Sequence, residues 1–310
     1  MKRIAVLMGG KSSEREVSLQ SGQNVAEALS SLGKYEVIPV DCTDETLAAM
    51  PKDVDAVYIA LHGGWGEIGG VQAALNALKI PYTGPGVQAS QIAMDKIKTK
   101  MVLEMKNVPT AKWSIVRLGD CSDCPIPFPV VVKPPKDGSS VGISKCRDND
   151  EFRKGLELAW SVDGKSNNRT IEQSNNLPIA LVEEFIPGRE FTVAVVDGEA
   201  WPVIEIVARG GWYGYEEKYN SNETQYPFLE DADLAPKMQK IAVEAYRAVG
   251  CRGVTRVDFR VSPLGRCYVL ELNTSPGFTS HSLVPKAGIR TGLTFAGVCD
   301  RILQSADYDR

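Results

Sequence analysis

The stretch "VTRVDFRVSPLGRCYVLELN" (residues 254–273) decides the fold of the C-terminal half, because two apolar runs flank a short turn and so predict a β-hairpin. Alternate side chains of a strand lie on one face of the sheet. Arg256 and Asp258 therefore point the same way on the first strand, and Glu271 and Asn273 share a face of the second. We expect this hairpin to gather three oxygen ligands and a guanidinium on one side.

These polar positions predict a metal site. Hard divalent cations such as Mg²⁺ take oxygen ligands, typically one or two carboxylates together with phosphate oxygens. A purely structural hairpin would carry apolar side chains at inward positions, since unpaired buried carboxylates cost free energy. A solvated polar face is the alternative that the strand pattern leaves open.

A loop suited to phosphate lies between two further apolar strands in "FPVVVKPPKDGSSVGISKC" (residues 128–146). Free backbone N–H groups, two hydroxyls and a lysine are the groups that bind a polyphosphate. The spacing is not that of a Walker A loop, and no helix follows directly, so a mobile surface turn is the alternative. The residues concerned are Lys133, Gly138, Ser139, Ser140 and Gly142.

The first 85 residues alternate strand-like and helix-like segments, an order that implies a parallel sheet with helices on its faces. Ser13 and Glu16 match a capping box at the start of the first helix. Glu14 lies in the first turn of that helix, where either the helix dipole or a ligand would favour a carboxylate. We expect strands at 3–8, 35–40 and 56–61, and helices at 14–32, 71–78, 91–106, about 150–160 and about 233–249.

The totals exclude several classes of protein. The chain has 310 residues and a net charge of -4, which argues against a nucleic-acid-binding surface spread over the whole molecule. No apolar run approaches the roughly 20 residues needed to span a bilayer, so we expect no membrane association. Seven scattered cysteines fit reduced thiols in the cytoplasm, and the lone C-x-x-C of Cys121 and Cys124 lacks the further ligands of a metal site.

Separated motifs resemble those of the D-alanine-D-alanine ligases, a family of the ATP-grasp superfamily of carboxylate-amine ligases. The resemblance implies an α/β fold, α+β in its C-terminal half, in which a parallel-sheet domain (residues 1–95) precedes a two-part ATP-grasp fold (residues 96–180 and 181–310). The motifs, in the family's order, are "GGKSSEREVSLQSG", "ALHGGWGE", "YTGPGVQAS", "MDKIKTK", "KPPKDGSSVGISK", "EKYNSNETQY" and "ELNTSPGFTSHSLVP".

What the resemblance implies is an enzyme of peptidoglycan precursor synthesis. ATP would phosphorylate one D-alanine carboxylate to an acyl phosphate, which the amine of a second D-alanine would attack. The partners implied are small molecules, D-alanine and ATP, together with two Mg²⁺ or Mn²⁺ ions and a second copy of the chain in a homodimer. Such a reaction requires three anionic groups to be brought together and a tetrahedral oxyanion to be stabilised.

The resemblance also assigns residues to the nucleotide. Lys96 and Lys133 would contact the ATP phosphates and the adenine region, and Lys218 would approach the γ-phosphate. The loop around Ser139 and Ser140 would close over the triphosphate. Adenine and ribose would be read by Glu183, the backbone near Phe185 and Ile186, and Glu190.

On the metal and reaction side, Asp258, Glu271 and Asn273 match the family's metal ligands. Arg256 would bind the acyl phosphate and its tetrahedral successor, because a guanidinium stays protonated at every physiological pH. The backbone N–H of Gly277 would be a second oxyanion donor.

The amino-acid substrates would lie against the N-terminal domain. Glu14 would take the ammonium of the first D-alanine, His62 would position substrate, and Ser282 and Leu283 would hold the carboxylate of the second at a helix N-terminus. Tyr219 and Ser139 would join Glu14 in a hydrogen-bonded set that ties the loop over the closed site.

Three residues depart from the family's usual pattern, namely Trp65, Glu184 and Arg260. The stem of Arg260 is expected to pack while its head reaches solvent. A ligase with a D-serine or D-lactate acceptor is the closest alternative function. A nucleotide-dependent oxidoreductase is disfavoured, because the G-x-G-x-x-G fingerprint is missing from the first strand-helix turn.

Overall fold

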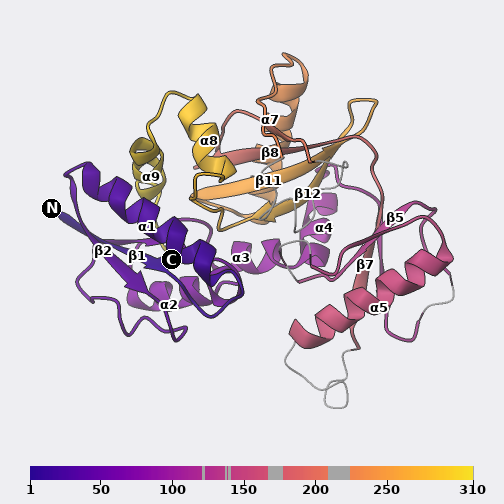
Figure 1. Ribbon diagram of the computed structural model, residues 1–310, viewed down its shortest axis with the longest axis horizontal. Helices are drawn as coiled ribbons and strands as arrows, with labels where there is room; N and C mark the ends of the chain where they lie inside the picture. The colour runs from indigo at the N-terminus through magenta and orange to yellow at the C-terminus, as the bar shows by residue number, and fades with distance from the viewer. Residues whose placement is uncertain (121–122, 137, 139–140, 167–176, 209–223, 310) are drawn as a thin grey trace.

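A parallel sheet forms one end of the molecule (Figure 1). The computed structural model describes residues 1–120, 123–136, 138, 141–166, 177–208 and 224–309. The first sheet has the strand order β2-β1-β3, and the central strand is buried from Ile4 to Met8. Its elements are β1 (Lys2–Met8), α1 (Arg15–Ser31), β2 (Tyr35–Asp41), β3 (Ala56–Ile59), the short 3-10 helix η1 (Gly64–Gly66) and α2 (Gly70–Leu78).

The start of α1 differs from the expected capping box. Its N-cap residue is Glu14, and no side chain caps the helix there. The hydroxyl of Ser12 instead accepts from the Glu14 N–H at 3.2 Å and donates to the His62 carbonyl at 2.5 Å. The local turn thus ties Glu14 to the loop after β3, and the capping-box prediction for Ser13 and Glu16 is wrong.

The single helix expected over residues 91–106 is two helices, α3 (Val87–Ala93) and α4 (Lys96–Met105). Asp95 separates them with an extended backbone, and its carboxylate accepts from the Lys98 N–H at 3.2 Å. An aspartate that caps a new helix in this way competes with continuation of the old one. The break places Lys96 at a helix start, where its N–H donates to the Pro135 carbonyl at 2.8 Å.

The second sheet, at the other end of the molecule, is antiparallel with the order β4-β7-β5-β6 (Figure 1). Helix α5 covers one face through Phe152, Leu156 and Ala159, which are buried with strand residues. The boundary expected at residue 180 falls within β7. The elements are β4 (Trp113–Arg117), β5 (Val130–Lys133), β6 (Ser144–Cys146), α5 (Asn149–Ser166) and β7 (Ile179–Glu184).

A third sheet, β10-β8-β11-β12, lies between the other two and contains the predicted hairpin (Figure 1). Strand β9 pairs with β8 across Asp197 and Gly198, both of positive φ, as the predicted turn requires. The elements are β8 (Arg189–Val196), β9 (Glu199–Ala200), β10 (Ile204–Ile206), α7 (Leu234–Val249), β11 (Val254–Val261) and β12 (Cys267–Asn273).

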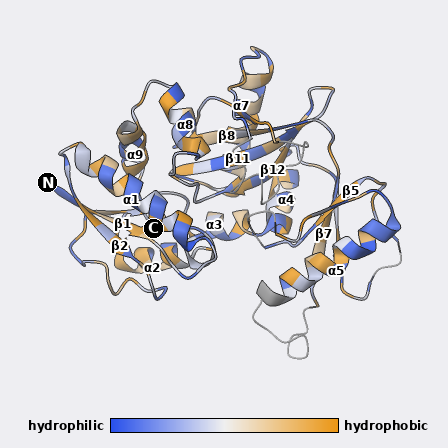
Figure 2. Ribbon diagram, in the orientation of Figure 1, coloured by the Kyte–Doolittle hydropathy of each residue, from blue (hydrophilic) through white to orange (hydrophobic). Residues whose placement is uncertain are grey.

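The last helices, α8 (Leu283–Arg290) and α9 (Phe295–Leu303), return to the N-terminal sheet. One apolar core contains Val6 of β1, Val284 of α8 and Ile302 of α9. In Figure 2, hydrophobic and hydrophilic residues alternate along α1 and α5, as expected of helices with one buried face. Among the described residues, no helix is both long and apolar enough to cross a membrane. The expected α/β class, with antiparallel sheets in the C-terminal half, is confirmed.

Candidate active site

The hairpin face predicted from strand parity is present. Arg256 lies directly opposite Asn273, and Asp258 directly opposite Glu271. The register shifts immediately after Asp258, so a bulge follows the polar pairs without displacing them. The two strands thus hold four functional side chains on rigid backbone.

Asp258 and Arg256 form a two-pronged pair along β11. Arg256 donates from Nε to Oδ1 at 2.9 Å and from Nη2 to Oδ2 at 2.8 Å, and Thr192 of β8 donates to Oδ1 at 2.6 Å. Only 6% of Asp258 is exposed, and these partners satisfy the oxygens that burial removes from water. The arginine and the carboxylate are thereby both oriented before any ligand binds.

The donor set of this face fits a hard divalent cation. Asp258 and Glu271 offer carboxylate oxygens, and the Asn273 amide has its oxygen fixed by the Ser275 N–H at 3.1 Å. Glu271 also has Lys96 of α4 at 3.7 Å, with the lysine almost fully buried. The described residues contain no group of three or more His, Cys, Asp or Glu placed to hold a metal, and the predicted set has two such residues and an amide.

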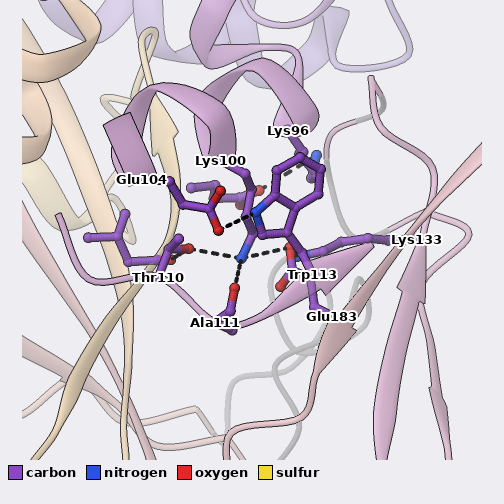
Figure 3. A network of polar contacts seen from close by, with 10 residues as sticks. Lys96, Lys100, Glu104, Thr110, Ala111, Trp113, Lys133 and Glu183 are labelled. Atoms are coloured by element: carbon purple, nitrogen blue, oxygen red, sulfur yellow. Dashed lines mark hydrogen bonds and ion pairs between the residues drawn. The ribbon is translucent and has the colours of Figure 1, made fainter. Parts of the chain in front are cut away.

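A second cluster of charges lies one helical turn along α4 (Figure 3). Glu183 of β7 is fully buried, with Lys133 of β5 at 2.8 Å and Lys100 of α4 at 3.2 Å from its Oε1. Burial opposes ionisation of Glu183, yet the two lysines together hold its pKa below the usual range. Burial lowers the pKa of Lys100 to about 8, and Glu183 acts in the opposite direction.

The strand end after Glu183 carries the residues expected to read adenine and ribose. Ile186 is buried, and Phe185 has the Lys145 ammonium 3.7 Å from its ring centroid. Arg260 does not reach solvent, because it is only 8% exposed and donates to Glu190 and to the Ile186 carbonyl, each at 3.3 Å. The expectation of a solvent-exposed Arg260 head is therefore wrong, since two acceptors hold the guanidinium inside.

The N-terminal domain brings Glu14 against the loop after β3. Gly63 has a φ of +67°, and a Cβ there would lie 3.1 Å from Glu14 Oε2 and 3.0 Å from Ser12 Cβ. This close approach requires glycine. Glu67 interacts with the backbone of Gly63 in the same loop, and no pattern in the sequence pointed to it. Burial raises the pKa of Glu67 to about 8, Glu14 adds to the rise, and Arg256 opposes it.

His62 holds two segments together. Its Nδ1 lies 3.0 Å from the Ser275 carbonyl, and its Nε2 lies 3.0 Å from the Ser21 hydroxyl. Burial lowers the pKa of His62, while Glu14 and the Ser275 carbonyl raise it. A carbonyl can only accept, so Nδ1 carries the proton and neutral Nε2 accepts from Ser21. With both ring nitrogens engaged, His62 is built to position rather than to take a proton.

The loop after β12 presents Gly277 and Ser282 to the same region. A Cβ on Gly277 would lie 2.8 Å from Ser282 Oγ, and the Phe278 N–H donates to Ser21 Oγ at 3.1 Å. Ser282 is the extended N-cap residue of α8, whose first residue is Leu283, and its hydroxyl accepts from the Thr279 N–H at 2.9 Å. Ser282 also lines an open cavity between α1 and α8.

Some of the remaining candidates lie in segments that the structure does not describe. Lys218, Tyr219, Ser139, Ser140 and Cys121 lie outside the described residues. Trp65 and Glu184 are both partly buried.

Family models and curated relatives both match the D-alanine-D-alanine ligases. Family models described as the D-ala D-ala ligase N-terminus and C-terminus match residues 3–48 and 102–304. A D-alanine--D-alanine ligase of Syntrophotalea carbinolica is 42% identical, covering 98% of this chain and 96% of that protein. One from Geobacter sulfurreducens is 40% identical, covering 98% and 94%.

Solved structures show the same likeness. The D-alanine--D-alanine ligase of Bacillus anthracis complexed with ATP superposes with a TM-score of 0.83 at 31% identity, covering 98% of this chain and 97% of that one. The D-Ala:D-Ser ligase of Enterococcus faecalis gives a TM-score of 0.79 at 27% identity, covering 98% of both chains.

Proposed function

This chain belongs to the D-alanine-D-alanine ligase family, and on that premise we propose that it joins two D-alanine molecules into D-alanyl-D-alanine at the expense of ATP. A carboxylate oxygen of the first D-alanine takes the γ-phosphoryl group, which gives an acyl phosphate and ADP. The amine of the second attacks the carbonyl carbon, a C–N bond forms, and the C–O bond to phosphate breaks. The amine loses its proton, and inorganic phosphate leaves.

The observation that carries this proposal is the face of the β11-β12 hairpin. Arg256 opposite Asn273 and Asp258 opposite Glu271 form a site for anions and cations together, and Lys96 approaches Glu271 at 3.7 Å. Phosphoryl transfer needs such positioned charge more than it needs covalent chemistry. A hairpin with a merely solvated polar face would not place these groups in register or bury Asp258.

Asp258, Glu271 and Asn273 would hold two Mg²⁺ or Mn²⁺ ions, which would neutralise phosphate charge. Lys96 and Lys133 bind phosphate oxygens, assisted by Lys218, while Ser139 and Ser140 close over the triphosphate. Glu183, Phe185, Ile186 and Glu190 receive the adenosine. Arg256 and the Gly277 N–H stabilise the oxyanion as the carbonyl becomes tetrahedral.

On the substrate side, Glu14 pairs with the ammonium of the first D-alanine, and His62 holds the loop that faces it. Ser282 and the Leu283 N–H take the carboxylate of the second, where α8 begins. Tyr219 and Ser139 link the closing loop to Glu14. These roles rest on family membership and on the proximity of Glu14, His62 and the Ser275 loop.

The wider setting follows from the same premise. The protein acts in the cytoplasm as a homodimer, in synthesis of peptidoglycan precursors. Its parts are a substrate domain over residues 1–95, a lid domain over 96–180 and a catalytic domain over 181–310.

The acceptor is tested by incubating the protein with ATP, Mg²⁺ and D-alanine, with and without D-serine or D-lactate, and identifying the products by mass spectrometry. D-Alanyl-D-alanine is expected as the main product in every mixture. If product forms only when D-serine or D-lactate is present, the acceptor is that compound and not D-alanine. If phosphate is released without any dipeptide or ester, the proposed ligation is wrong.

A further inference from the structure

Lys100 is a buried cation to which the proposed reaction assigns no part. It is 1% exposed, and its Nζ lies 2.8 Å from Thr110 Oγ1, 3.2 Å from the Ala111 carbonyl and 3.2 Å from Glu183 Oε1 (Figure 3). Fully buried lysines are rare, because a desolvated ammonium is costly unless it is paired. A residue retained there at such a cost needs an explanation.

The position of Lys100 links it to both halves of the nucleotide site. Lys96 and Lys100 are four residues apart on α4 and so lie on one face of the helix. Lys96 approaches Glu271 of the β11-β12 hairpin at 3.7 Å, whereas Lys100 approaches Glu183 of the second sheet at 3.2 Å. Helix α4 therefore bridges the end of the site expected to hold phosphates and the end expected to hold the base.

The anchor of Lys100 is itself fixed. Thr110 accepts from Lys100 and donates to the Val269 carbonyl of β12 at 2.8 Å, and the Val269 N–H donates to the Pro109 carbonyl at 2.9 Å. The Lys100 ammonium is thus held in a fixed position relative to β12 through Thr110. Its ammonium is already engaged by Thr110, Ala111 and Glu183, so we expect Lys100 to act on a nucleotide through Glu183.

We infer that Lys100 is a positioning residue that holds the Glu183 carboxylate ionised and aimed at the nucleotide base, and that it thereby makes the site select adenine over guanine. This inference rests on the proposed use of ATP. An ionised carboxylate only accepts hydrogen bonds. It can accept a hydrogen bond from the 6-amino group of adenine, and it repels the 6-carbonyl oxygen of guanine. A protonated Glu183 could donate to that oxygen, and the discrimination would fall.

Lys133 cannot carry this task alone. Lys133 also pairs with Glu183, at 2.8 Å, but it is one of the lysines expected to contact the nucleotide, so its charge is shared between Glu183 and the ligand. Two cations stand against one desolvated carboxylate, and both distances are to Oε1. A carboxylate has about four lone-pair sites, so acceptor capacity remains for a base.

The test is calorimetric titration of the full chain with ADP and GDP in the presence of Mg²⁺. Lys100→Met is expected to reduce the preference for ADP over GDP by about tenfold or more, chiefly by weakening ADP, because a buried polar group loses its partner. Lys98→Met is the matched control, since Lys98 lies on the same helix with its side chain 58% exposed, and it should leave the preference unchanged.

Loss of Lys100 leaves a buried charge with one partner fewer, so a second variant guards against misfolding. Thr110→Val keeps the shape and removes the hydroxyl that orients Lys100, and it should reduce the preference by a smaller factor with circular dichroism unchanged. A structural role alone would weaken both nucleotides equally, and that result overturns the inference. So does a wild-type chain that binds both equally. A wild-type chain that binds neither nucleotide overturns the proposed function instead.

Discussion

Arg256 is the residue on which the proposed chemistry depends most. It is 17% exposed and is held by both oxygens of Asp258, so it reaches the site in one orientation. A lysine keeps the charge and offers no planar fork for two acceptors. The same feature that orients Arg256 also makes it hard to replace.

We predict that Arg256→Lys lowers the rate of dipeptide formation by about 100-fold or more, as expected when an oxyanion donor is lost. Coupled measurement of phosphate release and dipeptide gives the rate. Arg266→Lys, an exposed arginine in the turn of the same hairpin, is the control and should retain full activity. An Arg256→Lys enzyme as fast as the wild type would remove Arg256 from the mechanism.

The raised pKa of Glu67 makes the free energy of unfolding depend on pH. Its pKa is about 8 in the native state against an ordinary value of 4.5, so between these values the folded chain holds a proton that the unfolded chain releases. The free energy of unfolding therefore falls as pH rises from about 4.5 to 8. The full cost is present above pH 8.

Glu67→Gln should remove that cost. We expect the variant to match the wild type at pH 5 and to exceed its free energy of unfolding at pH 8, by something of the order of 4 kcal/mol at most. Urea unfolding without metal or nucleotide measures the difference. Equal stability of the two proteins at pH 8 would show that Glu67 ionises freely.

At the scale of elements, the break between α3 and α4 sets the place of Lys96 and Lys100. Asp95 makes the break by capping α4 through the Lys98 N–H. Removing an N-cap carboxylate typically costs about 1 kcal/mol. Because α4 carries both buried lysines, fraying of its first turn also disturbs the nucleotide site.

Asp95→Ala is therefore expected to lower the free energy of unfolding by about 1 kcal/mol and to weaken ADP binding. Asp95→Asn, which can still cap, is the control and should restore most of both quantities. Urea unfolding and calorimetric titration provide the two readings. Unchanged stability in Asp95→Ala would mean that the helix start is fixed by its tertiary contacts alone.

The elements also show what a sequence can predict. Strand parity placed Arg256, Asp258, Glu271 and Asn273 on one face, because a period of two leaves no other choice once the hairpin is recognised. The break at Asp95 was missed because apolar spacing runs on through both helices, while a single local hydrogen bond decides the conformation. Local competition of this kind is invisible to periodicity.

The burial of Lys100 and the raised pKa of Glu67 could not be predicted for a different reason. A lysine on an amphipathic helix resembles a solvated residue until two sheets pack against that helix. Glu67 owes its raised pKa to burial and to the nearby Glu14, while the distant Arg256 opposes the rise, and only the tertiary fold assembles these groups. The face that strand residues share could thus be predicted, whereas the helix starts at Glu14 and Asp95 and the surroundings that come from packing could not.

On the scale of the whole molecule, the C-terminal segment closes on the N-terminal domain. Asp307 exchanges backbone hydrogen bonds with Tyr82, and Asp309 accepts from the Val87 N–H at the start of α3 at 2.9 Å and from Asn76 at 3.1 Å. The loop after β12, with Gly277 and Ser282, is tied to α1 by Ser21. The substrate region is therefore formed by parts far apart in sequence.

Asp309→Ala should loosen this closure. We predict a loss of about 1 to 2 kcal/mol in the free energy of unfolding, since several hydrogen bonds to one carboxylate disappear. Asp307→Ala also removes an exposed carboxylate from this segment, but it keeps the backbone hydrogen bonds between residue 307 and Tyr82. It therefore serves as the control. Thermal unfolding followed by circular dichroism compares them, and equal midpoints for both variants would contradict the tether.

The acyl phosphate is the central claim, and oxygen transfer tests it most directly. D-Alanine labelled with ¹⁸O in its carboxylate is incubated with the protein, ATP and Mg²⁺, and the released phosphate is analysed by mass spectrometry. One labelled oxygen should appear in each phosphate, because the carboxylate oxygen attacks phosphorus and stays with it when the amine displaces it. Dipeptide formed together with unlabelled phosphate would contradict the account.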